Sequence, residues 1–386
     1  MKKLVGTIVF CFLAIIATGQ YVVKGEVYNK NRQPVEGVTI SVAKGNQTLL
    51  YTISSRDGSF SISGLKKKGT YQLSAGHVGM RSSTKVIEVD EALTIVDFEL
   101  EESAFFLEPL EVKSVRASDK APFTKTNLSK VDVAKNNLGQ DLPFLLNQTP
   151  SVVINSDAGN GVGYTGIRIR GSDATRINVT MNGIPYNDPE SQGTFFVDMP
   201  DIASSLNSIQ IQRGVGTSSN GAGAFGATIN LSTNEFIDSA YGEFNNSFGS
   251  FNTWKHTLKA GTGLINNHFT VDVRMSKLSS DGFIDRAFSD LKSLYLSTAY
   301  FTKNSSLRFN IITGKEKTYQ AWNGIPESML TSNRTYNSAG TEKPGEPYNN
   351  ETDNYQQDHY QLFFNHSFNN NLTFNTTLFL TKGNGY

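Results

Sequence analysis

The residues best placed by type and spacing to do chemistry are a glycine run, five histidines and one polar loop. The run Gly221-Ala222-Gly223-Ala224-Phe225-Gly226 matches the dinucleotide fingerprint, in which glycines let the backbone approach a pyrophosphate. That fingerprint must open a helix, whereas the residues from Thr228 to Leu231 have the pattern of a strand. We therefore interpret these glycines as turn formers rather than as a nucleotide site.

The other reactive side chains show no catalytic arrangement. No Ser/His/Asp order stands in a nucleophile-elbow context, and the single cysteine, Cys11, lies in an apolar N-terminal run. The five histidines are scattered without metal-ligand spacing: His77, His256, His268, His359 and His366. The sequence predicts no enzyme, no metal site and no cofactor.

The loop from Tyr186 to Phe195 is the best candidate for ligand contact. It reads YNDPESQGTF and offers aromatic faces beside amide and hydroxyl donors. Such a mixture suits a polar chelate or a glycan. A solvated loop without ligand contact is as well supported residue by residue, so both interpretations stay open.

The loop belongs to a longer stretch, residues 167–233, that alternates short apolar strands with loops rich in Gly, Asn, Asp and Ser. Ile167 and Ile169 alternate with two arginines, which is the period of a strand. The run from Ile177 to Met181 meets Asn182-Gly183, the strongest short hairpin signal. A strand pattern returns from Ile209 to Gln212.

This succession resembles the plug domain of TonB-dependent outer-membrane receptors. Four ordered landmarks carry the resemblance: Arg170-Gly171, Asn182-Gly183-Ile184-Pro185, Arg213-Gly214, and the glycine-rich run from Gly221 to Asn230. The one departure is Asn182, where the family prefers Asp, and Asn tolerates the same left-handed turn. The resemblance implies an α+β plug over residues 120–236. Near its start, Val131-Asp132 looks like part of a strand, and the run from Leu138 to Leu146 looks like a short helix.

The resemblance also implies roles for plug residues. In the family, plug apices face the exterior and touch the ligand, and three apices map to residues 155–164, 171–175 and 186–195. The implied ligand contacts are Ser172, Asp173, Tyr186, Asn187, Asp188, Glu190, Gln192 and Phe195. Ionic locks against carboxylates of the barrel wall are expected of Arg168, Arg170 and Arg213, because an unpaired buried charge is costly.

Composition indicates an exported, mostly β protein. The 386 residues include 35 Lys+Arg and 35 Asp+Glu, so no basic excess points to a nucleic-acid partner, and 34 Gly, 25 Phe and 15 Tyr favour strands and turns. Met1-Lys2-Lys3, a short apolar run and small residues predict a signal peptide over residues 1–19. The apolar run is too short for a membrane anchor.

Two segments precede the plug. Residues 20–103 predict a small β-sandwich and resemble the carboxypeptidase-regulatory-like domain, with an inert spacer or docking module as the expected role. Residues 104–119 form a linker whose alternating pattern after Pro109 predicts extended chain. By position it resembles the TonB box, which pairs with TonB by strand addition, although an ordinary linker strand fits the residues about equally well. The candidate box is Leu110, Glu111, Val112, Lys113, Ser114 and Val115.

Residues 237–386 predict long amphipathic strands joined by short and long loops in turn, the pattern of a transmembrane β-barrel. We count about seven strands, whereas plugged outer-membrane transporters have 22. Seven strands cannot close around a plug, and an open edge is not tolerated in lipid. We therefore expect the N-terminal portion of a longer, apparently truncated receptor.

The leading hypothesis is a TonB-dependent outer-membrane receptor that imports a scarce nutrient, with a periplasmic N-terminal domain. The resemblance implies a metal chelate such as a ferric siderophore, or a corrinoid, as ligand. It implies TonB with the ExbB/ExbD energising complex, and outer-membrane lipid, as partners. The alternatives are a glycan-importing SusC-like receptor, a non-transporting truncated binding module, and a secreted soluble β adhesin whose apolar faces would turn inward.

Overall fold

The computed structural model describes residues 21–44, 47–77, 80, 82–101, 116–118, 121–220, 223–234, 236–237, 239–266, 268–302, 304–369 and 372–386. The predicted signal peptide (1–19) and the TonB-box candidate (110–115) lie outside the described residues. The contacts divide the chain into two units, Met1–Phe106 and Leu107–Tyr386. In the part of the chain that the structure describes, no helix combines the length and the apolar character needed to cross a membrane.

The N-terminal unit is a β-sandwich, as the strand spacing predicted. One sheet has the order β4-β1-β7, with β8 also paired to β1, and the other has the order β3-β2-β5-β6. Alternate side chains such as Val23, Ile40 and Leu73 are fully buried between the sheets. The strands are β1 (Tyr21–Asn29), β2 (Thr39–Lys44), β3 (Gln47–Ile53), β4 (Ser59–Leu65), β5 (Gly69–Gly76), β6 (Ser83–Val89), β7 (Leu93–Ile95) and β8 (Phe98–Leu100).

The second unit begins with a small α+β domain built on a sheet of order β13-β12-β15-β14-β9. Strand β12 pairs with β15 in parallel, and a separate hairpin joins β10 to β11. Its elements are β9 (Lys125–Ser129), α3 (Lys130–Asn136), α4 (Leu142–Leu145), β10 (Val152–Ser156), β11 (Thr165–Ile169), η2 (Ala174–Arg176), β12 (Ile177–Met181), β13 (Ile184–Pro185), η3 (Phe196–Asp198), η4 (Ile202–Ser205), β14 (Ser208–Arg213), η5 (Ser218–Asn220) and β15 (Ala227–Ser232).

Helix α3 begins where the sequence had suggested a strand around Val131. A capping box causes the difference: the Ser129 side chain accepts from the Asp132 backbone N–H, and the Asp132 carboxylate accepts from the backbone N–H of Ser129. Val133 then packs into the core of the domain.

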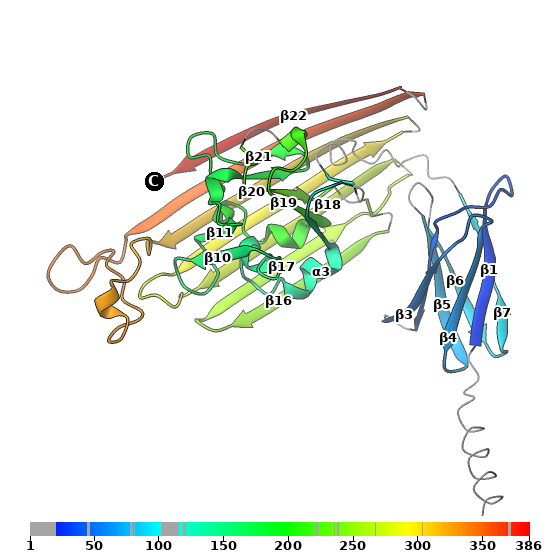
Figure 1. The fold of residues 1–386 in the computed structure, drawn as a ribbon, viewed down its shortest axis with the longest axis horizontal. Helices are drawn as coiled ribbons and strands as arrows, with labels where there is room; N and C mark the ends of the chain where they lie inside the picture. The colour runs from blue at the N-terminus through cyan, green and yellow to red at the C-terminus, as the bar shows by residue number, and fades with distance from the viewer. Residues whose placement is uncertain are drawn as a thin grey trace, which may run out of the picture. The chain divides into compact units, whose positions relative to one another are not determined.

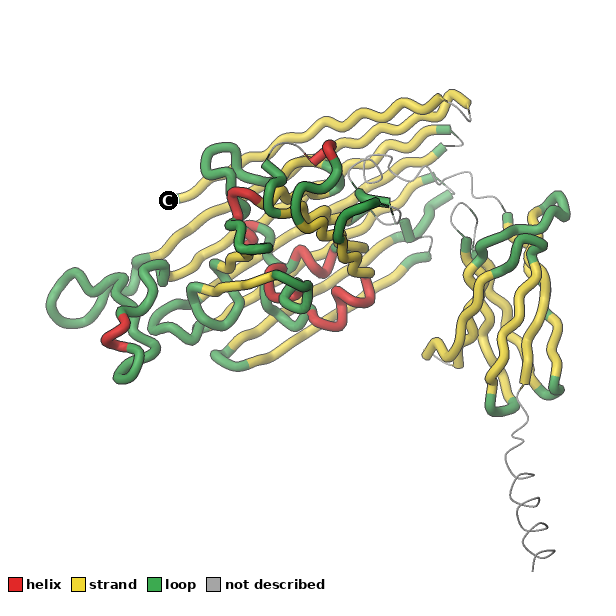
Figure 2. Tube along the Cα trace, in the orientation of Figure 1, coloured by secondary structure: helices red, strands yellow, loops and turns green. Residues whose placement is uncertain are grey.

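The rest of the unit is one antiparallel sheet in sequential order, β16 to β22, which matches the predicted count of about seven strands. Figures 1 and 2 show this broad sheet with the α+β domain against one of its faces. The long connection between β20 and β21 and the eight-residue connection between β18 and β19 emerge at one end, called here the long-loop end. The elements are β16 (Tyr241–Gly249), β17 (Thr253–Gly261), β18 (Phe269–Ser280), β19 (Ser289–Phe301), β20 (Ser305–Tyr319), η6 (Glu327–Met329), β21 (Thr352–Asn369) and β22 (Leu372–Gly385).

The long antiparallel sheet has apolar side chains on its outer face and polar side chains on the face toward the α+β domain. On β20, Leu307 and Phe309 are 44% and 36% exposed on the outer face, while Arg308 and Asn310 are buried on the face toward the α+β domain. Apolar residues facing outward and polar residues facing inward are the reverse of a soluble sandwich and match a sheet whose solvent is lipid. The secreted-adhesin alternative predicted inward apolar faces and does not fit.

Candidate functional site

A cavity lies where the α+β domain meets the long-loop end of the sheet. We call it the outer cavity. Its volume is about 200 Å³. The α+β domain contributes the loops around Tyr164 and Tyr186 and the short helix η3, and β20 and β21 contribute the opposite wall. The cavity is lined by Tyr164, Tyr186, Asp188, Phe195, Asp198, Glu316, Asp353, Tyr355 and Gln357.

The outer cavity is acidic. Tyr164 Oη lies 3.2 Å from Glu316 Oε1 and 2.5 Å from Asp353 Oδ2, so one hydroxyl serves two carboxylates. Burial, followed by these two carboxylates, raises the pKa of Tyr164 far above its ordinary value. Burial, followed by the charges of Asp353 and Asp188, raises the pKa of Asp198 to about 7. The phenol therefore stays protonated, while Asp198 titrates near neutral pH.

Asp198→Asn is expected to flatten the pH dependence of stability. Because the folded state holds the Asp198 proton more tightly than the unfolded state, wild-type stability is present at low pH and is lost as the pH rises through about 7. We expect the wild type to lose roughly 2 kcal/mol more than the variant between about pH 5 and 8. Thermal unfolding of the two proteins across that range measures the difference.

Asp173→Asn is the control, because hydrogen bonds from Thr175 lower the pKa of Asp173 and its charge is constant over that range. Parallel pH profiles for the wild type and Asp198→Asn would contradict the prediction.

Three of the eight predicted ligand contacts line the outer cavity: Tyr186, Asp188 and Phe195. Asn187 instead fixes the shape of the loop, because its Nδ2 donates to the carbonyls of Ile177 and Gln192, both at 2.9 Å. The other four residues, Ser172, Asp173, Glu190 and Gln192, are not among the lining residues.

These four residues lie at two different places in the α+β domain. Ser172 and Asp173 precede β12, and Ser172 lies beside Gly226. Glu190 and Gln192 are exposed at the loop tip, where Gln192 Nε2 donates to the Pro189 carbonyl at 2.8 Å.

Sequence reasoning missed the barrel half of the cavity. Glu316, Asp353, Tyr355 and Gln357 are contributed by β20 and β21. The available signal was the alternation itself: Glu316 has the same parity as the inward-facing Arg308 and Asn310. Register then pairs Glu316 with Tyr355 and places both on the inner face.

A buried ionic cluster fastens the α+β domain to the sheet. Asp201 Oδ1 lies 2.8 Å from Lys255 Nζ, and Asp201 Oδ2 lies 3.6 Å from Arg274 Nη1. The hydroxyls of Ser204, Thr257 and Ser276 each donate to the carboxylate at 2.6 Å. Burial would raise the pKa of Asp201, but Arg274 and Lys255 outweigh it and hold the pKa well below its ordinary range.

The arginines predicted as locks are not part of this cluster. Arg170 Nη2 donates to Thr124 Oγ1 at 2.8 Å and Arg213 Nη1 to the Pro150 carbonyl at 3.3 Å, both within the α+β domain. Arg168 is exposed, because Ile167 and Ile169 occupy the buried face of β11. In the Asp201 cluster the carboxylate comes from the α+β domain and the cations come from the barrel strands.

The hairpin turn of β12 and β13 makes a second attachment. Asn182 and Gly183 both have positive φ, 55° and 84°, as an Asn-Gly hairpin requires. Asn182 Nδ2 donates to Gln361 Oε1 on β21 at 3.0 Å and to Thr233 Oγ1 at 2.9 Å. An Asp carboxylate could not donate these bonds, so the departure from the family pattern has a structural use here.

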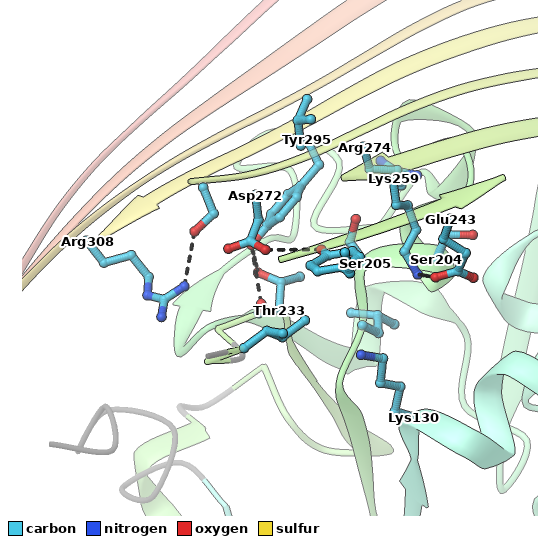
Figure 3. A pocket seen from close by; sticks show the side chains of 15 residues that line it. Lys130, Ser204, Ser205, Thr233, Glu243, Lys259, Asp272, Arg274, Tyr295 and Arg308 are labelled. Atoms are coloured by element: carbon cyan, nitrogen blue, oxygen red, sulfur yellow. Dashed lines mark hydrogen bonds and ion pairs between the residues drawn. The ribbon is translucent and has the colours of Figure 1, made fainter. Parts of the chain in front are cut away.

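A second cavity, of about 280 Å³, is lined by residues 204–206 and by side chains of β16 to β20, among others. Figure 3 shows the side chains around it. We call it the inner cavity. Its charged side chains have partners within the protein. Lys259 Nζ lies 3.0 Å from Glu243 Oε2, and Tyr241 Oη donates to Asp272 Oδ1 at 3.0 Å. Arg308 Nη1 donates to Ser297 Oγ at 3.0 Å. These polar groups of the inner cavity thus bind one another.

The chain enters this unit through an anchored segment. Arg116 Nη1 donates to Ser208 Oγ at 2.9 Å, and Arg116 Nη2 donates to the carbonyls of Ser208 and Asn230, both at 3.2 Å. The backbone N–H of Ala117 donates to Gln210 Oε1 at 2.7 Å. The start of the unit is thereby tied to β14 and β15.

Among the described residues, no group of three or more His, Cys, Asp or Glu side chains is arranged to hold a metal ion.

Comparison with known families decides what the α+β domain is. Residues 117–228 match the TonB-dependent Receptor Plug Domain, and residues 22–101 match the Carboxypeptidase regulatory-like domain. The chain thus corresponds to the N-terminal portion of a TonB-dependent receptor. The predicted order of regulatory-like domain, plug and barrel strands is confirmed. The α+β domain is called the plug from here on, and the seven-stranded sheet the barrel sheet.

Solved structures share the fold of this receptor at low identity. The ferric-catecholate import receptor Fiu from E. coli K12 aligns over 71% of this chain and 40% of its own with a TM-score of 0.55 and 18% identity. The siderophore receptor PirA from Acinetobacter baumannii aligns over 73% and 42%, with a TM-score of 0.52 and 16% identity.

The ferric yersiniabactin uptake receptor FyuA from Yersinia pestis aligns over 68% of this chain and 41% of its own, with a TM-score of 0.52 and 12% identity. The chain thus spans about two fifths of the length of the solved receptors. Comparison with curated protein sequences finds no match.

Proposed function

We propose that this chain forms the gated entry of an outer-membrane transporter that imports a metal chelate, a ferric siderophore or a corrinoid. The observation that supports it most is the outer cavity, which plug and barrel sheet build jointly at the long-loop end. A ligand that touches both walls would bind differently when the plug moves, which is the requirement for coupling binding to gating. The ferric-chelate receptors that share the fold support the same class of ligand.

The proposed drive is TonB, energised by ExbB and ExbD, acting on residues 110–115 in the periplasm. Strand addition there would need backbone N–H and C=O groups rather than particular side chains. A pull on that segment would reach the plug through Arg116, whose guanidinium is bonded to β14 and β15. Transport rather than catalysis is therefore the proposed activity.

Val112→Pro is expected to abolish energised uptake while leaving ligand binding intact. Proline removes a backbone donor that strand addition uses. Uptake of radiolabelled hydroxamate, catecholate and carboxylate ferric chelates and of cobalamin by cells carrying each variant gives the measurement, with binding to de-energised cells as the second readout. Lys113→Ser is the matched control, because it changes a side chain and keeps the backbone donor.

Three results would count against the proposal. Uptake by Val112→Pro at the wild-type rate would remove the strand-addition step. Uptake of oligosaccharides and of no chelate would favour the glycan receptor, for which the run from Gly223 to Ile229 lacks the family pattern. Binding without energised uptake of any compound would favour a non-transporting module.

A further inference from the structure

The lining of the outer cavity is one-sided in charge. It contains four carboxyl side chains, Asp188, Asp198, Glu316 and Asp353, and among the described residues that line it there is no Lys, Arg or His. The remaining surface is three tyrosines, one phenylalanine and one glutamine. We infer that the outer cavity receives a positively charged organic group of the ligand, an ammonium or a guanidinium. This inference rests on the proposed function and names the chemical class of its ligand.

Two buried polar atoms point to a missing partner. Glu316 is 1% exposed and its Oε2 has no hydrogen-bond partner, and Tyr186 is 7% exposed and its Oη has none. Both residues line the outer cavity. A buried oxygen without a partner costs free energy, and a donor entering the cavity would remove that cost. An ammonium or guanidinium brings several donors and no acceptor.

The hydroxyl of Tyr164 does not neutralise the carboxylates. It has one proton to offer to Glu316 and Asp353, and it carries no charge to balance theirs. Asp198 is also affected by neighbouring acidic groups, since burial and then the charges of Asp353 and Asp188 raise its pKa. The cluster thus differs from that of Asp201, where two cations balance one buried carboxylate.

Shape and aromatic content narrow the class. A volume of about 200 Å³ is below that of a site for a whole drug-sized ligand, so the outer cavity accepts a side arm. Tyr164, Tyr186 and Tyr355 also line the cavity, and the face of a tyrosine ring attracts an organic cation by cation–π interaction. A trianionic ferric tris-catecholate has no cationic arm for this cavity and would be repelled by its carboxylates, so we expect it to bind more weakly than a chelate that carries an ammonium or a guanidinium.

A matched pair of chelates tests the inference. The ferric complex of desferrioxamine B ends in a free ammonium group, and its N-acetyl derivative is the same chelate without that charge. We expect the full-length receptor in detergent micelles to bind the ammonium form at least about ten-fold more tightly by calorimetry. The double variant Glu316→Gln/Asp353→Asn should remove this preference, and Glu243→Gln, in the inner cavity, should keep it.

The outcomes separate this inference from the proposed function. Equal affinity for the two chelates, or tighter binding of a tris-catecholate, overturns the inference while chelate binding stands. If neither chelate binds, 1,6-diaminohexane decides by thermal shift. Stabilisation of the wild type but not of the double variant then supports the cationic site and counts against chelate import. No stabilisation of the wild type overturns the inference.

Discussion

Asp201→Asn is expected to destabilise the plug by about 3–5 kcal/mol, the range for removing one partner from a buried ion pair. The substitution keeps the size of the side chain, and Asn tolerates the left-handed conformation of residue 201, whose φ is 53°. What is lost is the negative charge between Lys255 and Arg274, which are 3% and 2% exposed. Two buried cations would then face each other without a counter-charge.

Hydrogen–deuterium exchange of residues 199–206 in the intact receptor measures this loss locally, and thermal unfolding measures it globally. Glu243→Gln is the control, because Glu243 also pairs with a lysine of the barrel sheet but its side chain is 46% exposed. An exposed pair is worth less than about 1 kcal/mol. Unchanged exchange in Asp201→Asn would show that the cluster does not hold the plug.

Gly314→Ala is expected to unseat the plug at a second place, at a cost of about 3 kcal/mol for overpacking. A Cβ on Gly314 would lie 1.9 Å from the backbone oxygen of Asp198 and 2.8 Å from Cδ of Pro200. Backbone atoms cannot turn away as a flexible side chain can, so the segment around η3 must move. Because Asp198 lines the outer cavity, the affinity for ligand should fall with the stability.

Gly242→Ala is the matched control, since Gly242 also lies in a strand of the barrel sheet and a Cβ there meets no atom within 4 Å. Thermal unfolding and ligand binding of the two variants measure the effect. Equal stability of the two variants would mean that the plug does not touch the barrel sheet at Gly314.

Local patterns predicted the strands and failed at one helix. Alternation of apolar residues located β18 and β20, and Asn182-Gly183 located the hairpin, because each pattern acts between neighbouring residues. Helix α3 was not predicted, although Ser129 and Asp132 have capping-box spacing. A local signal was present and was interpreted wrongly.

The site was predictable only on the plug side. Tyr186, Asp188 and Phe195 belong to one loop, so composition could single them out. Their partners Glu316 and Asp353 follow more than one hundred residues later, and strand register alone brings them to the cavity. The Asp201 cluster could not be predicted either, because it depends on which side chains of the plug and of the barrel sheet meet after folding.

The attachment of Arg116 bears on how the plug would respond to mechanical load. Tension applied upstream of residue 116 is first resisted by three hydrogen bonds of one guanidinium, and then by β9, the edge strand of the five-stranded sheet. An edge strand is held on one side only, so it can separate while β12, β15 and β14 stay paired. The Asp201 cluster is not part of that sheet: Asp201 is the N-cap residue of η4, and it pairs with Lys255 and Arg274 of the barrel sheet. The Arg116 hydrogen bonds and β9 would therefore give way before the Asp201 cluster does. A moderate force would then unfold part of the plug while the Asp201 cluster still holds the rest to the barrel sheet.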